Sequence, residues 1–132
     1  MRVFLDTNVL VSAVATRGLC ADLFRYVLVE HELLVGEVVL VELERVLVER
    51  IKVPQQTMAE IERLLRDQQV VRRPDRHLNL GLRDPDDEWI VASAAAAKTD
   101  ALVTGDADIL DEKDRIPLAV FSPRQFWLHV RR

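Results

Sequence analysis

The sequence predicts an α/β fold, built as one domain over residues 1–132. Short β-branched runs alternate with longer segments in which apolar residues recur every three or four positions. The length is that of one ordinary domain, and 49% of the residues are hydrophobic, which is enough for a buried core. Because helices separate the short strands, we expect parallel pairing, right-handed crossovers and helices on both faces of one sheet.

The first half of the chain alternates between the two kinds of element. We predict strands at residues 3–5, 33–35 and 70–71, and helices at residues 19–30, 37–50 and 58–68. The spacing of Leu19, Leu23 and Val27 is typical of one face of a helix. We interpret Asp6-Thr7-Asn8, directly after the first strand, as a turn.

A helix start in the second half has the strongest local signal in the sequence. Asp84-Pro85-Asp86-Asp87 combines a capping Asp, a Pro at the first helical position and acids in the first turn, so residues 88–98 should be helical. Strands are expected at residues 101–104 and 118–121. Ser122-Pro123 then opens a last helix that runs through Val130.

The charge balance gives no support for indiscriminate binding to nucleic acid. The formal net charge is −4, whereas such binding usually draws on an excess of Lys and Arg. Basic residues are nevertheless concentrated between residues 63 and 83, and we take Arg72, Arg73 and Arg76 as candidate phosphate contacts. The alternative is that the arginines of this stretch pair with nearby acids of a helix surface, such as Glu60 and Glu62.

Cysteine and hydropathy patterns favour a cytoplasmic protein. Cys20 is the only cysteine, which excludes an intrachain disulfide, and the N-terminus does not resemble an export signal. Apolar runs are interrupted by charge well before the roughly 20 residues that a membrane span requires, so we expect no membrane insertion. Trp89 and Trp127 are expected in the core or in an interface, with stacking on an RNA base as the alternative.

Two acidic residues follow predicted strands, and parallel topology should bring them together. Asp6 ends the first strand, and Asp106 follows the strand at 101–104. In open parallel sheets, ligands bind beyond the carboxyl ends of the strands, where the connections diverge. Each acid taken alone also has a structural interpretation, as part of a turn at Asp6 or Asp106, or as a helix start for Asp84 and Asp87.

Glu42 is the acid that a purely structural interpretation explains least well. Its predicted helix carries Val39, Leu43 and Val46 on one stripe, and Glu42 lies on that same face. A carboxylate that points inward needs a partner, because burying it alone costs several kcal/mol or forces protonation. A buried Arg and a metal ion both remain possible as that partner.

Taken together, the acids predict a cation site. Carboxylates a few Å apart raise one another's pKa, and a hard cation with oxygen ligands relieves the repulsion. Since no Cys or His is among them, Mg²⁺ or Mn²⁺ is favoured over Zn²⁺ or copper. Such ions activate water and stabilise the charge that develops during phosphodiester cleavage. The four acids that we expect to converge are Asp6, Glu42, Asp87 and Asp106.

These motifs resemble the PIN-domain family in their order along almost the whole chain. They are residues 6–13 (DTNVLVSA), Glu42-Leu43, residues 84–87 (DPDD) before an Ala-rich helix, and residues 103–106 (VTGD). The similarity is greatest to short prokaryotic PIN proteins that act as toxins, the VapC-like group. It implies a three-layer α/β/α sandwich around a short parallel sheet, and a PIN-like nuclease domain over residues 1–132.

The resemblance also implies chemistry and partners. It implies a Mg²⁺- or Mn²⁺-dependent endoribonuclease, a small antitoxin protein that holds it inactive, and a homodimer. It assigns catalysis and metal binding to Asp6, Glu42, Asp87 and Asp106, with Asn8 and Thr104 as supporting polar groups. Three spare acids leave the last two positions open to a shift of two or three residues, namely Asp84, Asp86 and Asp108.

Three other functions are alternatives to a nuclease. A response-regulator receiver needs paired acids after the first strand, but Asp6 stands alone there, and a haloacid-dehalogenase-type phosphatase needs an Asp at the position of Asn8. Both are therefore poor fits. The remaining alternative is a catalytically silent PIN-like module that serves binding or assembly, although acids occupy all four positions of the expected quartet.

Overall fold

The computed structural model describes residues 1–131 and contains a five-stranded sheet with the order β3-β2-β1-β4-β5. Every neighbouring pair of strands is parallel. The strands are β1 (Arg2–Leu5), β2 (Glu32–Gly36), β3 (Gln69–Val71), β4 (Ala101–Val103) and β5 (Ala119–Phe121). The predicted α/β class and parallel sheet are thus confirmed.

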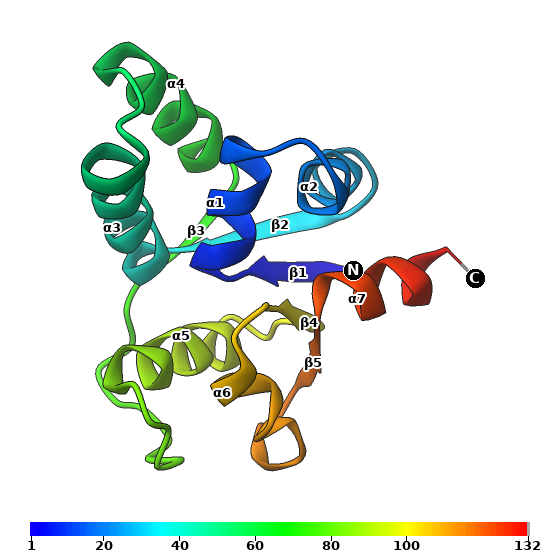
Figure 1. The fold of residues 1–132 in the computed structure, drawn as a ribbon. Helices are drawn as coiled ribbons and strands as arrows, with labels where there is room; N and C mark the ends of the chain where they lie inside the picture. Colours follow the sequence, from blue (N-terminus) through cyan, green and yellow to red (C-terminus); the bar gives the residue numbers. More distant parts are fainter. Residues whose placement is uncertain (132) are drawn as a thin grey trace.

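Helices cover both faces of this sheet, which gives the three-layer sandwich expected from the resemblance (Figure 1). In Figure 1 α1 to α4 lie in the upper half of the view, and α5 and α6 lie in the lower half, level with β4 and β5, while α7 packs against α2. The helices are α1 (Thr7–Ala15), α2 (Leu19–Glu30), α3 (Glu37–Val46), α4 (Gln55–Arg66), α5 (Pro85–Ala96), α6 (Ala107–Leu110) and α7 (Pro123–Val130). A π-helical turn, η1 (Leu47–Ile51), follows α3, and a 3₁₀ turn, η2 (Lys113–Arg115), follows α6.

The core lies between the sheet and its two helical layers. Phe4, Leu34 and Leu102, from the three central strands, are completely buried. Strands covered on both faces need apolar residues at consecutive positions, and this explains why β1, β2 and β4 read as continuous apolar runs. The end of β2 is packed especially closely: a Cβ atom at Gly36 would lie 2.8 Å from the Phe4 ring.

Three predicted elements were wrong in detail. Asp6-Thr7-Asn8 is not a free turn, because Asp6 caps a helix, α1, that begins at Thr7. The predicted helix 37–50 is α-helical only to Val46 and continues as the π-helical turn η1, after which Lys52 adopts a left-handed conformation. Helix α4 begins at Gln55, directly after Pro54, which is three residues earlier than the apolar stripe at Met58 indicated.

The order of the strands places the candidate site. From β1 the chain moves outward through β2 to β3, then returns to place β4 on the other side of β1. The connections therefore diverge between β1 and β4, which is where open parallel sheets bind ligands. Leu5 pairs with Val103 across this boundary, so Asp6 and Thr104 follow their strands side by side.

Residues 72–84 connect β3 to α5 without regular secondary structure. The buried carboxylate of Glu88 holds this segment by accepting hydrogen bonds from the backbone N–H groups of Leu80 and Leu82, each at 3.0 Å. The Arg115 guanidinium donates to the Leu80 carbonyl oxygen at 2.6 Å. Within residues 1–131, the structure has no helix that is both long enough and apolar enough to cross a membrane.

Candidate metal centre

Asp6 lies at the carboxyl end of β1 and is 2% exposed. Its Oδ1 atom accepts a hydrogen bond from the backbone N–H of Thr7 at 2.7 Å, and its own N–H donates to the Val103 carbonyl oxygen at 3.0 Å. Its Oδ2 atom accepts from the Thr104 hydroxyl at 2.6 Å. The side chain is thereby fixed by both central strands of the site.

Thr104 and Asn8 join the ends of β1 and β4. The Thr104 hydroxyl, which donates to Asp6, accepts from the Asp106 N–H at 3.0 Å. The Asn8 side chain donates to Asp6 Oδ2 at 3.4 Å and accepts from the Gly105 N–H at 2.9 Å. Both residues therefore connect the Asp6 carboxylate to the backbone that follows β4.

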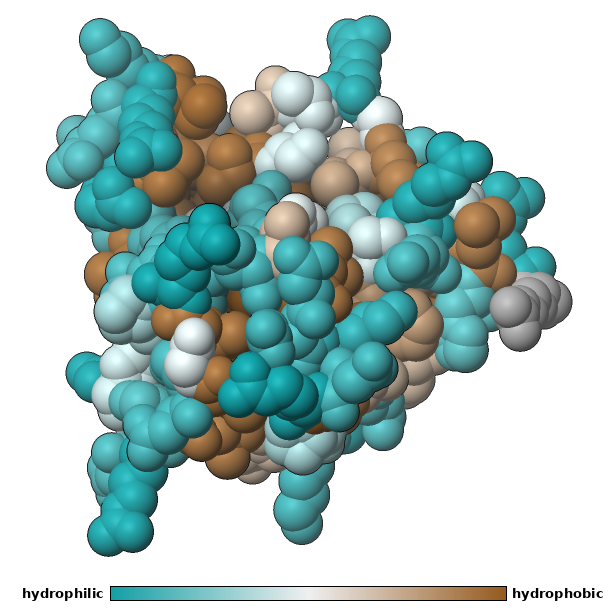
Figure 2. Space-filling view, turned by 60° about the horizontal axis from the view of Figure 1, so that its bottom comes forward, coloured by the Kyte–Doolittle hydropathy of each residue, from teal (hydrophilic) through white to brown (hydrophobic). Residues whose placement is uncertain are grey.

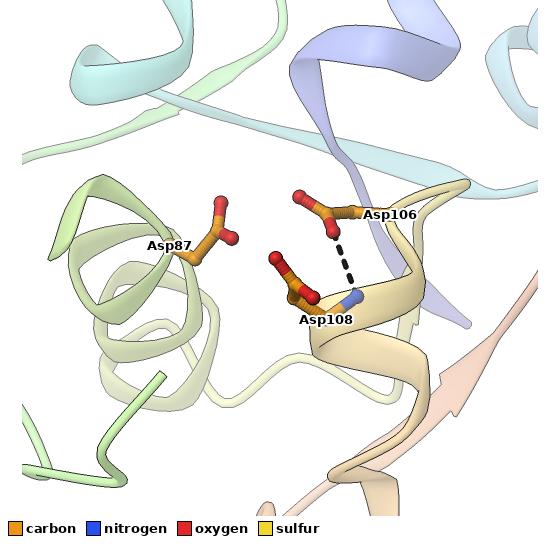
Figure 3. A group of neighbouring side chains, drawn as sticks. All are labelled: Asp87, Asp106 and Asp108. Carbon is orange, nitrogen blue, oxygen red and sulfur yellow. Dashed lines mark hydrogen bonds between the residues drawn. The ribbon is translucent and has the colours of Figure 1, made fainter. Parts of the chain in front are cut away.

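Asp106 caps the short helix α6, where its Oδ1 atom accepts a hydrogen bond from the Asp108 N–H at 2.9 Å. Asp108 lies in the first turn of that helix. The carboxylates of Asp87, Asp106 and Asp108 each offer an oxygen atom within 4.8 Å of the others. In Figure 3 the three carboxylates point toward one another across the gap between α5 and α6.

Asp87 contributes the most deeply buried carboxylate of this trio. It lies in the first turn of α5, and its Oδ2 atom is buried without a hydrogen-bond partner among the described residues. A buried, unpartnered carboxylate oxygen costs free energy unless a proton or a cation reaches it. Asp87 therefore has the environment expected of a metal ligand.

Electrostatic repulsion links Asp87 and Asp106 to Asp6. Burial and then the negative charges of Asp106 and Asp6 raise the pKa of Asp87 from 3.8 to about 8. Burial also raises the pKa of Asp6, against the lowering effect of the hydrogen bonds from Thr104 and Thr7, and the charge of Asp106 adds to the rise. Without a cation, the ionisation of one of these acids raises the pKa of the others, so they titrate as a coupled group.

Glu42 lies beside this group, half-buried on α3. Burial raises the pKa of Glu42, and the negative charges of Asp6 and Asp86 raise it further, while Arg45 opposes them. Among residues 1–131, no Arg or Lys forms a salt bridge with Glu42, so the alternative of a structural ion pair has no support.

The three spare acids, Asp84, Asp86 and Asp108, lie in different surroundings. Asp84 is exposed and caps α5, accepting a hydrogen bond from the Asp86 N–H at 2.9 Å. Asp86 is exposed and lines a pocket together with Glu42. Asp108, by contrast, shares the trio with Asp87 and Asp106.

Comparison with known families gives a clear assignment. The family model for the PIN domain matches residues 2–108, which include all of the acids described above. The chain belongs to the PIN-domain family. A search among curated proteins finds no match.

Solved structures share this PIN-domain fold. One is the crystal structure of VapBC2 from Rickettsia felis bound to a DNA fragment from their promoter, with a TM-score of 0.69 and 20% identity over 92% of this chain and 98% of that chain. Another is DNA-bound VapBC from Salmonella typhimurium, with a TM-score of 0.63 and 19% identity over 93% of this chain and 98% of the other. At this level of identity the similarity concerns the fold.

Three contacts near the PIN-domain acids were missed by the sequence analysis. Glu88, expected only as a helical residue, binds the backbone of the preceding segment. The Arg73 guanidinium carbon lies 3.8 Å from the centroid of the Trp89 ring, and the His77 ring meets the same indole edge-on. No local pattern could have revealed these contacts, since they depend on how residues 72–84 fold back over α5.

The candidate phosphate contacts differ in their surroundings. Arg72 and Arg76 are exposed, and Arg73 lines the pocket beside Glu42. Among the ion pairs of residues 1–131, none involves these three arginines, whereas Arg66 pairs with Glu62 and Glu37. The alternative of helix-surface pairing therefore applies to Arg66 and not to the three candidates.

Proposed function

We propose that this protein is a divalent-metal-dependent endoribonuclease and the toxin of a toxin–antitoxin pair. The observation that carries the proposal is the Asp87 carboxylate, buried with one unpartnered oxygen and within 4.8 Å of Asp106 and Asp108. Membership in the PIN-domain family adds independent support. A fold that needs no cation would gain nothing from this arrangement, because the repulsion destabilises it.

The donor set fits Mg²⁺ or Mn²⁺. Every candidate ligand atom is a carboxylate oxygen, and hard, small cations prefer such ligands. Asp87, Asp106 and Asp108, whose carboxylates converge, would hold the ion, with Asp6 and Glu42 at its margin. When bound, the ion would make a water more acidic and neutralise the charge that develops on the phosphodiester.

The protein's own residues would hold that site in a fixed geometry. Thr104 donates to Asp6 and accepts from the Asp106 N–H, so a single hydroxyl sets the relative positions of two acids. Asn8 fixes the loop at Gly105. Rigid support of this kind matters, because small displacements of catalytic groups cost large factors in rate.

RNA is the substrate that the surrounding surface supports best. Arg73 lines the pocket that Glu42 shares, and Arg72 and Arg76 are exposed on the same segment. Guanidinium groups bind phosphate oxygens in a bidentate manner. Figure 2 shows one face of the molecule, on which hydrophilic side chains project and apolar ones lie between them.

The proposed partners follow from the proteins of similar fold. Those structures are of VapBC assemblies, and we infer that a small antitoxin covers the acidic site here as well. A basic side chain of that antitoxin would compete with the metal ion for the carboxylates. We further propose a homodimer that acts in the cytoplasm, where cellular RNA is accessible.

Replacing Asp6 tests the nuclease proposal. Asp6→Asn keeps the shape of the side chain and removes its charge, so Mn²⁺-dependent cleavage of a mixed RNA pool should fall to background. Arg124→Gln on α7 serves as the matched control and should cleave like the wild type. Undiminished cleavage by a folded Asp6→Asn protein would contradict the assignment and favour a catalytically silent binding module.

Expression in cells tests the toxin proposal separately. Induction of the wild type without a partner should arrest growth, and induction of Asp6→Asn at the same protein level should not. Sequencing the RNA fragments left after brief induction would identify the cleavage sites. Harmless overexpression of an enzyme that cuts RNA in vitro would contradict toxicity while leaving the nuclease activity intact.

A further inference from the structure

A pocket of about 430 Å³ lies between α3 and α5, next to the acidic site. Glu42 belongs to both regions, because it lines the pocket and because the negative charge of Asp6 raises its pKa. The pocket wall combines aliphatic, aromatic, acidic and guanidinium groups in a small space. Its lining residues are Glu37, Val38, Val41, Glu42, Arg45, Arg73, Asp86, Trp89 and Ile90.

Trp89 gives this pocket a flat aromatic surface. The Arg73 guanidinium carbon lies 3.8 Å from the centroid of the indole. The His77 ring approaches the indole at 4.9 Å and an interplanar angle of 81°, and so buttresses it edge-on. His77 in turn lies 3.4 Å from Glu88, the carboxylate that holds residues 72–84 in place. His77 therefore supports the Trp89 ring, and Glu88 in turn lies beside His77.

The position of Trp89 relates it to the acidic site. A helix turns by about 100° per residue, so Trp89 lies on the opposite side of α5 from Asp87 and on the same side as Asp86, which also lines the pocket. Because Asp86 precedes Asp87 directly, a nucleic-acid strand with one phosphate at Asp87 and Asp106 would reach the pocket by passing Asp86. Bases stack on aromatic rings and on guanidinium planes, whereas a carboxylate-rich wall alone would repel the strand.

We propose that this pocket, the Trp89 pocket, binds one unpaired nucleobase of the RNA strand, next to the phosphate that is cut. The base would stack on the Trp89–Arg73 pair, and the Arg73 charge would offset the acids nearby. Since the Asp86 carboxylate in the wall offers hydrogen-bond acceptors, the wall favours bases that carry an amino group. This inference rests on the proposed nuclease function and adds a determinant of substrate choice.

Tryptophan fluorescence can test the pocket directly. The chain has two tryptophans, and Trp127 lies on α7, where it packs edge-on against Tyr26. In an Asp6→Asn/Trp127→Phe protein, all tryptophan fluorescence comes from Trp89. An RNA tetranucleotide should quench its emission in a saturable manner, and an abasic tetranucleotide of equal charge should not.

Affinity measurements should agree with this result. Binding of a labelled tetranucleotide to the Asp6→Asn protein should weaken on the order of 5- to 150-fold with Trp89→Leu and less with Trp89→Phe. Trp127→Phe should bind as tightly as its parent. Melting curves would confirm that each variant is folded, and Trp89→Phe keeps the test valid if Trp89→Leu is not.

The outcomes separate this inference from the proposed function. Equal affinity for abasic and normal RNA, or no effect of Trp89→Leu and Trp89→Phe, would overturn the pocket even if the wild type cuts RNA in an Asp6-dependent manner. Trp89-dependent binding by a protein that cuts no RNA would support the pocket and contradict the nuclease. Quenching by a basic peptide but not by RNA would assign the surface to a protein partner and overturn the proposal.

Discussion

Asp87 and Glu88 are adjacent in the first turn of α5, and they are only 5% and 6% exposed, yet their surroundings differ. Glu88 accepts hydrogen bonds from two backbone N–H groups and lies near His77; together these outweigh the effect of burial and lower its pKa. Asp87 has an unpartnered oxygen and faces other acids, and its pKa is raised.

We propose that this difference distinguishes a structural acid, Glu88, from a functional one, Asp87. The partners of Glu88 belong to the protein, so its charge stabilises the fold at neutral pH. The charge of Asp87 lacks such partners, so it destabilises the fold, and we propose that a metal ion compensates for it. Burial alone would not separate the two residues, and neither would their position in the helix.

RNA cleavage should show the largest contrast between them. Asp87→Asn removes a proposed metal ligand, and the cleavage rate should fall on the order of 100-fold or more. Glu88→Gln leaves the acidic site intact, so its rate should stay within about 10-fold of the wild type. Single-turnover assays well below the melting temperature of both variants provide the measurement. Equal losses of cleavage rate in the two variants would contradict the distinction between Asp87 and Glu88.

Stability in the absence of metal should change in the opposite sense. Glu88→Gln weakens the hydrogen bonds to Leu80 and Leu82, and the free energy of unfolding should drop by about 1 to 3 kcal/mol. Urea denaturation with EDTA provides the measurement, and Asp87→Asn, which relieves repulsion, is the matched comparison. A Glu88→Gln protein as stable as the wild type would contradict the structural role.

The pH dependence of the metal-free protein should follow from Asp87. Its folded-state pKa of about 8 exceeds the unfolded value of 3.8, so the folded state binds the extra proton between these two pKa values. Stability present below about pH 4 should therefore be lost as pH rises toward 8. Asp87→Asn should flatten this decline, and an unchanged slope in that variant would point to other groups.

The smallest expected effect concerns the arginines on the segment that Glu88 holds. Removing two phosphate contacts with Arg72→Gln and Arg76→Gln should reduce the slope of log affinity against log salt by about 1.4 for single-stranded RNA. Arg50→Gln with Arg124→Gln, on η1 and α7, removes the same charge elsewhere. If both pairs change the slope equally, the effect comes from net charge alone.

Much of the fold could be predicted because its signals are local. Apolar runs marked the strands, and Asp84-Pro85 marked the start of α5, since capping and proline geometry act within one turn. Helix α1 was missed because residues 9–11 and 13–14 are all apolar, so no helical period stands out. The π-helical turn at Leu47 has no comparable sequence signal either.

The candidate site was predictable only in part. Parallel topology brings Asp6 and Asp106 to one edge, so their proximity follows from strand order. The choice among Asp84, Asp86 and Asp87 depends on which of them α5 buries, and only the packed structure shows that this is Asp87. The roles of Glu88 and of the Arg73–Trp89 pair depend on the path of residues 72–84, which no local pattern specifies.

Thermal unfolding with EDTA and with millimolar Mn²⁺ tests the central claim most directly. An ion that binds only the folded state stabilises it by RT ln(1 + [L]/Kd), about 2.7 kcal/mol at 100 times Kd. The wild type and Glu88→Gln should gain the same increase in melting temperature from Mn²⁺, although Glu88→Gln starts lower. Asp87→Asn should have a higher melting temperature than the wild type in EDTA, and Mn²⁺ should raise it only a little. An equal gain for Asp87→Asn and the wild type would contradict the assignment of a metal site to this acidic edge.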